Sequence, residues 1–350
     1  MIKSVAIVGA GVSGLTCAVV FAERGCRTAI FAGEIGQRTT SGAAAALWFP
    51  YDAEPADKVI AWALQTYKVL VDLSCDARTG VSMIELHQFS RTNEIPIPDW
   101  AIPLGAQRLS AVATGLRPVS DRAQRGCHNL FRSGFTLSVP LMDTTIYLDY
   151  LANRFIKAGG EINPNVQFKK LEAVDPKFDL MINCAGIGAR ELVDDIDLEP
   201  HRGQVAIVPK IDNLNCAIVC DDEPLMYAIP RRNDCVFGGT NEISDNLAVD
   251  PAATSTIVAE CSRVLKIDNS RVLTERVGLR PFRKSGVRLE REPLRDGRTV
   301  IHNYGHGGSG FTLSWGCAEK VLALVSLFGG ASSGEPLISG RRGAPPSTRV

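Results

Sequence analysis

Three glycines near the start of the chain have the spacing of a phosphate-binding turn. Gly9, Gly11 and Gly14 follow the strand-like run 4–8 and open a helix expected over 12–23. In a G-x-G-x-x-G turn, the first glycine makes the bend, the second lets the backbone approach a pyrophosphate, and the third lets the helix pack closely on the strand. Amide groups at the start of the helix can then bind the anion. The sequence therefore predicts a dinucleotide site.

An acidic residue supports this interpretation. Glu34 follows a second strand-like run, 28–31, about 20 residues beyond the turn, where a carboxylate can bind a ribose hydroxyl. A glycine-rich turn without a ligand is the alternative. The strand, turn, helix and strand order favours the nucleotide site. The segment 39–48 is first hydroxylated and then rich in alanine, which suits close contact with a flat ligand, although a buried helical turn has the same composition.

The other elements predict an α/β fold with two interleaved parts. Helices are expected over 56–73 and over 144–157, with Asp143 as N-cap. A run at 179–184 and the run that begins at Val300 each end in a glycine turn, as expected if the chain returns to the parallel sheet. Another strand is expected over 166–168. A second, mainly antiparallel sheet is expected from the runs 203–208, 225–229, 235–238, 271–280 and 287–292.

The composition excludes several classes of protein. Lys plus Arg and Asp plus Glu both number 38, so no excess charge favours nucleic acid or an anionic membrane. The 350 residues are 45% hydrophobic, which is enough for a sizeable core. The ten cysteines show no C-x-x-C pair or zinc-ligand spacing, so we expect reduced thiols, no metal site and a cytoplasmic protein. Glycines interrupt the apolar stretch 5–22, so we expect neither a signal peptide nor a membrane span.

The C-terminal glycine motif identifies a family. The run 302–310 reads HNYGHGGSG and is followed, after five residues, by Gly316, Cys317 and Ala318, and this pattern resembles the signature of the D-amino acid oxidase family of flavoproteins. Further matches cover about residues 3 to 325 in order and spacing. They lie at 9–14, 45–51, 202–204, 227–230, 238–239, 278–281 and 288–292.

The resemblance implies a Rossmann-type FAD-binding domain with a parallel sheet, interleaved with a mainly antiparallel α+β substrate domain. We expect the FAD-binding domain over 1–55, 140–200 and 295–330, and the substrate domain over 56–139 and 201–294. Residues 331–350 are expected to be a disordered tail. A homodimer is an open alternative for the oligomeric state.

The implied activity is the FAD-dependent oxidation of a D-amino acid by O2. Arg280 matches the family arginine that binds the substrate carboxylate, and its planar fork suits two oxygens. Tyr227 matches the tyrosine that assists it, and Gly308 matches the glycine whose carbonyl accepts from the substrate amine. The resemblance also implies a set of residues that contact FAD. These are Gly9, Ala10, Gly11, Val12, Ser13, Gly14, Glu34, Thr39, Thr40, Ser41, Ala45, Ala46, Leu47, Leu171, Ala185, Gly186, Gly305, His306, Gly307, Gly308, Gly310, Phe311 and Thr312.

Departures from the family pattern bear on the substrate. Gly33 and Glu34 replace an Asp-Arg pair of mammalian relatives, and Glu223 replaces a second active-site tyrosine. The segment 204–227 is shorter, which predicts a shorter or more open lid. Enzymes for acidic substrates carry an additional arginine where this chain has 240–242, TNE, so we expect neutral or apolar D-amino acids. D-aspartate oxidase, a glycine or sarcosine-type amine oxidase, a non-catalytic flavin scaffold and an NAD-dependent dehydrogenase remain the alternatives.

Overall fold

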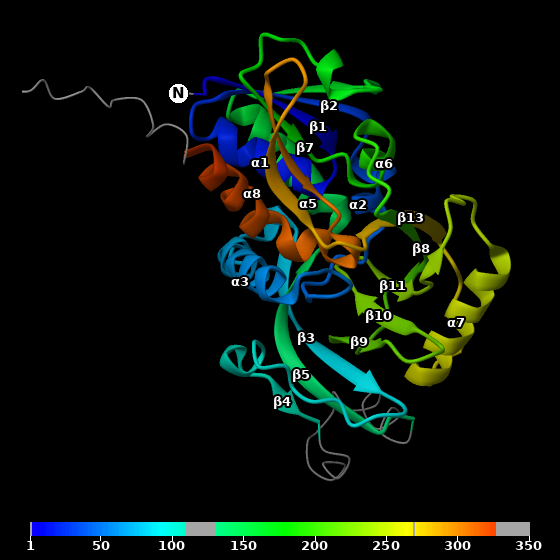
Figure 1. Ribbon diagram of the computed structural model, residues 1–350. Coiled ribbons are helices and arrows are strands. Elements are labelled where there is room, and N and C mark those ends of the chain that lie inside the picture. Colours follow the sequence, from blue (N-terminus) through cyan, green and yellow to red (C-terminus); the bar gives the residue numbers. More distant parts are fainter. Residues whose placement is uncertain (1, 110–129, 269, 327–350) are drawn as a thin grey trace, which may run out of the picture.

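The computed structural model describes residues 2–109, 130–268 and 270–326, and the fold is an α/β arrangement of two sheets (Figure 1). The first sheet has six strands in the order β14-β15-β7-β1-β2-β6. All neighbours are parallel except β14 and β15. The strands are β1 (Ser4–Ala10), β2 (Arg27–Ile35), β6 (Glu161–Pro164), β7 (Leu180–Asn183), β14 (Arg288–Pro293) and β15 (Thr299–Tyr304).

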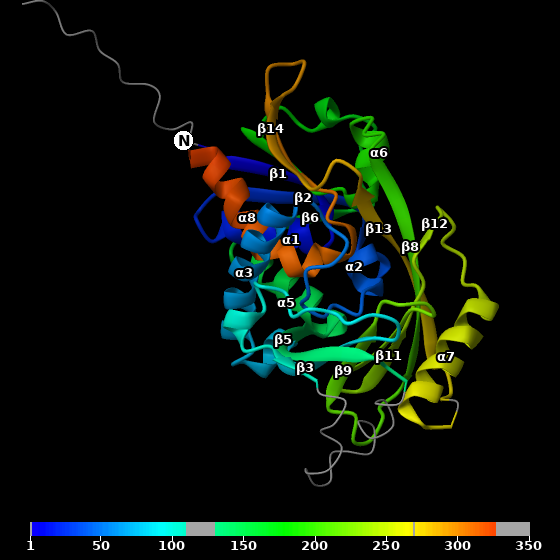
Figure 2. The same ribbon diagram turned by 60° about the horizontal axis from the view of Figure 1, so that its bottom comes forward.

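Helices cover one face of this sheet, and Figure 2 shows α1, α3, α5 and α8 together on that side of β1 and β2. Val5 and Ile7 point toward the helices, whereas the alternate residues Ala6 and Val8 pack against the segment around Phe178. Both faces of β1 are therefore buried, which explains its uninterrupted apolar sequence. The helices are α1 (Val12–Ala22), α2 (Thr40–Ala43), α3 (Ala56–Leu73), α5 (Thr144–Lys157), α6 (Ala189–Leu192), α7 (Pro251–Leu265) and α8 (Gly310–Ser326).

The second sheet is mainly antiparallel, with the order β12-β8-β11-β10-β9-β3-β5-β4 and with β13 paired to β8. Only β3 and β9 run parallel among its described pairs. Helix α7 covers one face, and the opposite face turns toward the first sheet. The strands are β3 (Val81–Ser90), β4 (Gln107–Arg108), β5 (Ser133–Met142), β8 (Leu198–Pro209), β9 (Cys216–Cys220), β10 (Met226–Pro230), β11 (Asp234–Gly238), β12 (Glu242–Ile243) and β13 (Thr274–Arg283).

Several predictions of individual elements are confirmed. Helices α3 and α5 have the expected bounds, and Asp143 caps α5 by accepting from the Thr145 amide. The runs at 179–184 and from Val300 do return to the parallel sheet as β7 and β15. The runs 225–229 and 235–238 are neighbouring antiparallel strands, β10 and β11.

Two strand predictions are wrong, and a third is shifted. Residues 166–168 are not a strand; β6 ends before them, at Pro164. The run at 287–292 does not join the antiparallel sheet, because β14 pairs with β15 at the edge of the first sheet. Strand β13 begins three residues later than expected, at Thr274. The predicted tail at 331–350 and Cys127 lie outside the described residues, and the domain boundaries stay a prediction.

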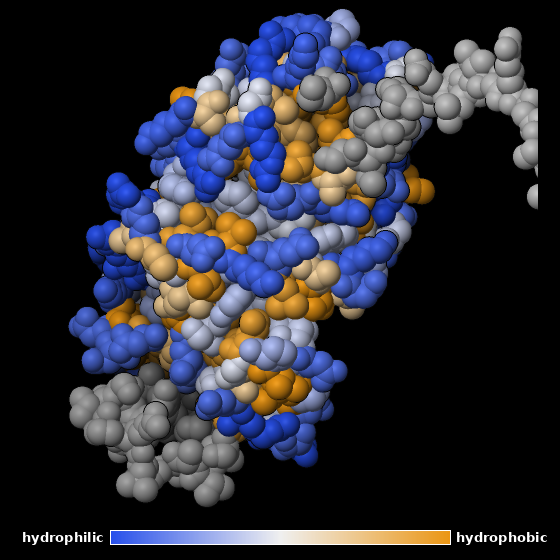
Figure 3. Space-filling model, turned by 90° about the vertical axis from the view of Figure 1, so that its left-hand side faces the viewer, coloured by the Kyte–Doolittle hydropathy of each residue, from blue (hydrophilic) through white to orange (hydrophobic). Residues whose placement is uncertain are grey.

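The apolar stretch 5–22 is accounted for by burial in the protein core. It forms β1, the glycine turn and α1, whose residues are almost all buried. In the described part of the chain, no helix is long and apolar enough to cross a membrane. On the face shown in Figure 3, hydrophobic side chains form several separate patches with hydrophilic side chains between them.

A buried hydrogen bond between α5 and α8 gives a stability prediction. The Trp315 indole N–H donates to the Tyr147 hydroxyl at 2.9 Å, and both residues are buried. Tyr147→Phe leaves this N–H without an acceptor, which should lower the free energy of unfolding by about 1–3 kcal/mol. Tyr150→Phe, on the same helix, removes a hydroxyl that is only half-buried and should cost about 0.5 kcal/mol or less. Urea unfolding measures both, and equal losses would contradict this role of the bond.

Candidate active site

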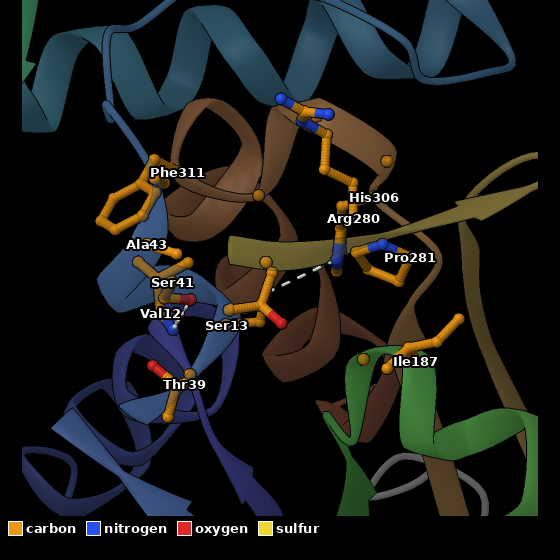
Figure 4. A pocket seen from close by; sticks show the side chains of 18 of the residues that line it. Val12, Ser13, Thr39, Ser41, Ala43, Ile187, Arg280, Pro281, His306 and Phe311 are labelled. Atoms are coloured by element: carbon orange, nitrogen blue, oxygen red, sulfur yellow. Dashed lines mark hydrogen bonds between the residues drawn. The ribbon is translucent and has the colours of Figure 1, made fainter. Parts of the chain in front are cut away.

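One large cavity of about 1020 Å³ extends between the two sheets. The carboxyl ends of β1, β2, β7 and β15 form one end of it, and the inner face of the antiparallel sheet forms the other. A volume of this size lies at the upper limit of typical small-molecule sites. Figure 4 shows part of its lining, where side chains from several elements lie around the same space.

The glycine turn after β1 has the geometry that its sequence predicts. Gly9 has a φ of +109°, and a Cβ added to Gly14 would overlap the Gly9 carbonyl, so the third glycine does allow α1 to pack closely. The N-cap of α1 is Gly11, which has no side chain, so the start of the helix is left open. The Val12 amide donates to the Ser41 hydroxyl at 3.0 Å, which ties the turn to α2 (Figure 4). The start of α1 faces the cavity and can receive a pyrophosphate.

The carboxyl end of β2 brings together residues that the sequence analysis missed. Glu34 lines the cavity, as predicted. The segment 166–169, which was not predicted, lines it as well. The Val166 amide donates to the Ala32 carbonyl at 3.0 Å and holds this segment beside β2. These residues follow β6, the parallel neighbour of β2, and carboxyl ends of parallel strands meet at one edge. The sequence could have indicated residues 166–169 as a turn that follows a parallel strand. It did not, because the strand was predicted over 166–168 and not over β6.

Four residues predicted to contact the cofactor are not among those that line the cavity: Gly14, Leu171, Gly305 and Thr312. Leu171 is buried in the cluster that packs under Ala6 and Val8 of β1, and its contact with the cofactor stays a prediction. Gly14 and Thr312 act through neighbours: Gly14 allows the close turn, and the Thr312 hydroxyl bonds the Phe49 amide at 3.1 Å. Phe49 itself lines the cavity. The other predicted cofactor residues do line it.

Small residues form the central wall. Residues 43–46 are all alanine and line the cavity, so a ligand there meets backbone and methyl groups. Thr39, Thr40 and Ser41 line it beside them, and Thr39 caps α2 by accepting from the Gly42 amide at 3.2 Å. The alanine wall can accept the flat ring of a ligand. The hydroxyl groups of residues 39–41 would then lie beside the phosphates of that ligand.

His306 joins the two glycine motifs. Its Nε2 lies 3.0 Å from the Asn303 Oδ1, and its Nδ1 lies 3.5 Å from the Ser13 hydroxyl, the contact drawn in Figure 4. Burial lowers the pKa of His306 to about 4, so the ring is neutral at neutral pH. A neutral, fully bonded ring suits a structural role between β15 and α1.

The other end of the cavity carries a fixed cation. Arg280, on β13, donates from Nη1 to the Thr240 carbonyl at 3.0 Å, and its guanidinium lies so close to Gly203 that a Cβ there would overlap it. The guanidinium also bonds the Tyr227 hydroxyl. Burial raises the pKa of Tyr227, so this hydroxyl stays protonated and can donate. The tyrosine ring lies directly against Gly238 and Gly239.

Gly308 lines the same cavity as this pair and is exposed. A Cβ on Gly308 would lie 2.7 Å from the Tyr51 ring, so only glycine fits beside that ring. Tyr51 belongs to the family match at 45–51, but the sequence did not predict it as a site residue. Burial, Asp221 and Asp52 raise its pKa to about 12. Glu223, a possible substrate contact by sequence, is exposed and is not among the lining residues.

These walls fit FAD on three observations. The turn at 9–14 leaves room for a pyrophosphate at a helix start whose N-cap, Gly11, has no side chain, the alanine wall admits a flat ring, and the start of α8 faces the same space through Gly310 and Phe311. A helix start carries partial positive charge, which favours negative charge gained by a ligand beside it.

The pKa of His306 gives a prediction of stability against pH. The unfolded chain takes up this proton near pH 6.5, whereas the folded chain takes it up only near pH 4. The unfolded state thus binds more protons between these values, so the free energy of unfolding should fall by up to about 3 kcal/mol as pH falls from 7 to 4. His306→Gln should make that decline shallower in urea unfolding at stepped pH, and an unchanged slope would contradict the assignment.

Comparison with known proteins shows the family of the chain. The sequence model of the family described as FAD dependent oxidoreductase matches residues 4–324. The chain is 38% identical to a D-amino-acid oxidase of Rubrobacter xylanophilus, over 91% of this chain and 94% of that protein. It is 39% identical to a D-amino-acid oxidase of Streptomyces coelicolor, over 92% and 96%.

The fold is also similar to that of a solved enzyme. The crystal structure of a glycine oxidase from Geobacillus kaustophilus superposes with a TM-score of 0.78 at 18% identity, over 92% of this chain and 94% of that one. At this identity the likeness concerns the fold alone. The family match over nearly the whole chain and the two bacterial relatives show that this chain belongs to the FAD dependent oxidoreductase family.

Proposed function

We propose that this flavoenzyme oxidises D-amino acids with O2. The observation that carries the proposal is that Arg280 and Tyr227 line the same cavity as Gly308 and the glycine turn after β1. Two relatives that are named D-amino-acid oxidase and match nearly the whole chain support it.

The Arg280 guanidinium would bind the substrate α-carboxylate. One of its amino groups is held by the Thr240 carbonyl, and the contact with Gly203 fixes the plane of the fork. A carboxylate accepts two parallel hydrogen bonds from such a fork. Because Tyr227 is protonated and bonded to the same guanidinium, its hydroxyl is in position to donate to a carboxylate oxygen as well.

Gly308 would hold the amine. Its backbone is exposed to the cavity, so its carbonyl can accept a hydrogen bond from the substrate amino group. Fixing the carboxylate at Arg280 and the amine at Gly308 leaves one enantiomer with its Cα–H directed at the alanine wall. The chemistry that bound FAD supplies there is a two-electron oxidation, in which the Cα–H hydride leaves the amino acid and O2 is finally reduced to hydrogen peroxide.

No side chain needs to remove a proton if the amine enters neutral. A histidine does lie on the cavity wall, His306, but its ring contacts Asn303 and Ser13 and its pKa is lowered by burial. The protein contributes orientation, a fixed cation and the helix start of α8. The imino acid that results would then hydrolyse to a 2-oxo acid and ammonia.

The cellular setting is also part of the proposal. Free thiols are buried in the described part of the chain, at Cys17, Cys184, Cys235, Cys261 and Cys317, which supports a reducing, cytoplasmic setting. A homodimer remains a hypothesis from sequence.

A direct test follows the flavin absorbance without oxygen. Purified protein should be yellow, and the flavin band should bleach on addition of a D-amino acid but not of its L-enantiomer, because only one enantiomer presents its Cα–H. Glycine and sarcosine belong in the same panel. Bleaching by glycine or sarcosine alone would favour an amine oxidase, and no bleaching by any of them would overturn the proposal in favour of a non-catalytic flavoprotein.

The carboxylate clamp gives a second prediction. Arg280→Ala should lower kcat/KM for a D-amino acid by an amount equivalent to about 2–5 kcal/mol, because the substrate carboxylate loses its buried cation. Arg232→Ala removes an exposed arginine between β10 and β11 and serves as the control. Both variants should retain FAD, and an unchanged kcat/KM in Arg280→Ala would show that the carboxylate binds elsewhere.

A further inference from the structure

An uncompensated carboxylate lies on the wall beside Tyr227. Asp221 follows β9 and stands two residues beyond Val219, so both side chains face the cavity. Val219 pairs with Tyr227 across the sheet, and Leu225 lines the cavity near the same turn. Asp221 is exposed and lines this cavity, and the surrounding protein desolvates it enough to raise its pKa.

A neighbouring amide orients this carboxylate. The buried Gln88, on β3, donates from Nε2 to the Asp221 Oδ2 at 2.9 Å. The Gln88 Oε1 accepts no hydrogen bond from any described residue. In the described part of the chain, the groups that set the pKa of Asp221 are its burial, the Gln88 amide and the Asp222 carboxylate, none of which is a cation. The wall thus offers the Asp221 carboxylate, which accepts from the Gln88 amide, and the Gln88 Oε1, which has no partner among the described residues.

The same cavity is therefore lined by both a cation, Arg280, and an anion, Asp221. The pKa of Tyr51 is raised by Asp221 and lowered by Arg280, so its hydroxyl lies in the field of both charges. Apolar side chains lie on the wall around them, namely Leu86, Val219 and Ile229. A ligand with a carboxylate at one end, methylene groups in the middle and a cation at the other end would match all three.

We propose that Asp221 binds the cationic end of the substrate side chain, so that D-amino acids with basic side chains are preferred substrates. This rests on the proposed D-amino acid oxidation. It departs from the neutral substrates expected from 240–242, because the carboxylate at 221 carried no signal in the sequence. It agrees with the expectation that acidic side chains are excluded, since two close carboxylates repel each other.

The test compares substrates of similar shape in a peroxide-coupled assay of the holoenzyme. D-lysine and D-norleucine have the same four-carbon chain and differ by the terminal ammonium. Wild-type kcat/KM should be at least about tenfold higher for D-lysine, as expected for a partly desolvated charge pair. This comparison needs no variant, so it holds even if a substitution prevents folding.

Asp221→Asn keeps the shape of the side chain and removes the charge. It should lower kcat/KM for D-lysine by about tenfold or more and change the value for D-norleucine by less than about threefold. Glu223→Gln is the matched control, because this acid lies two residues away, is exposed and does not line the cavity. It should leave both values unchanged.

The outcomes separate this inference from the proposed function. If D-norleucine is oxidised faster than D-lysine, or if Asp221→Asn affects both substrates equally, the role of Asp221 is overturned while D-amino acid oxidation stands. If no D-amino acid is oxidised, the proposed function itself fails. A D-lysine preference that Asp221→Asn abolishes and Glu223→Gln preserves supports the inference.

Discussion

The contact of the Arg280 guanidinium with Gly203 is the constraint on which the substrate end of the cavity depends. The absence of a side chain at 203 lets the arginine of β13 lie flat against β8, and the Thr240 carbonyl then fixes one amino group. The Tyr227 hydroxyl lies beside the same guanidinium. A charge that is held before the substrate arrives loses little entropy on binding, which is why a rigid β-sheet is a suitable support for it.

The parallel sheet provides the other half of the site by a different principle. Strands β1, β2, β7 and β15 all end at the cavity, so their following turns converge although they are distant in sequence. The glycine turns at 9–14 and 305–310 each lead into a helix, and the neutral His306 connects them. Two sheets thus meet at one space: one brings the backbone amides of the glycine turn, proposed to bind the nucleotide, and the other brings the Arg280 cation, proposed to bind a carboxylate.

Local sequence was sufficient where the chemistry is local. The spacing of Gly9, Gly11 and Gly14 is enough to predict the turn. The position of Asp143 before an apolar-periodic run is enough to predict the start of a helix. Arg280 and Tyr227 could be predicted only through the family pattern, since an arginine among several arginines has no distinguishing local signal. The strand at 166–168 was misplaced because β6 is only four residues long and has little apolar periodicity to mark it.

The residues that sequence reasoning missed are defined by long-range contacts. Tyr51 belongs to the site because its own ring packs on Gly308, which is more than 250 positions away along the chain. Asp221 is one acid of several in a loop, and only the pairing of β9 with β3 and β10 shows that it faces inward whereas Glu223 does not. Pairing of this kind cannot be derived from the order of residue types alone.

The most direct measurement of the central claim is a crystal structure of the holoenzyme with the 2-oxo acid product bound. The account predicts the product carboxylate on the Arg280 fork, with N···O distances of about 2.7–2.9 Å. It also predicts the Tyr227 hydroxyl on the same carboxylate and the flavin ring over the alanine wall at 43–46. A carboxylate bound elsewhere, with Arg280 still bonded only to protein groups, would contradict it.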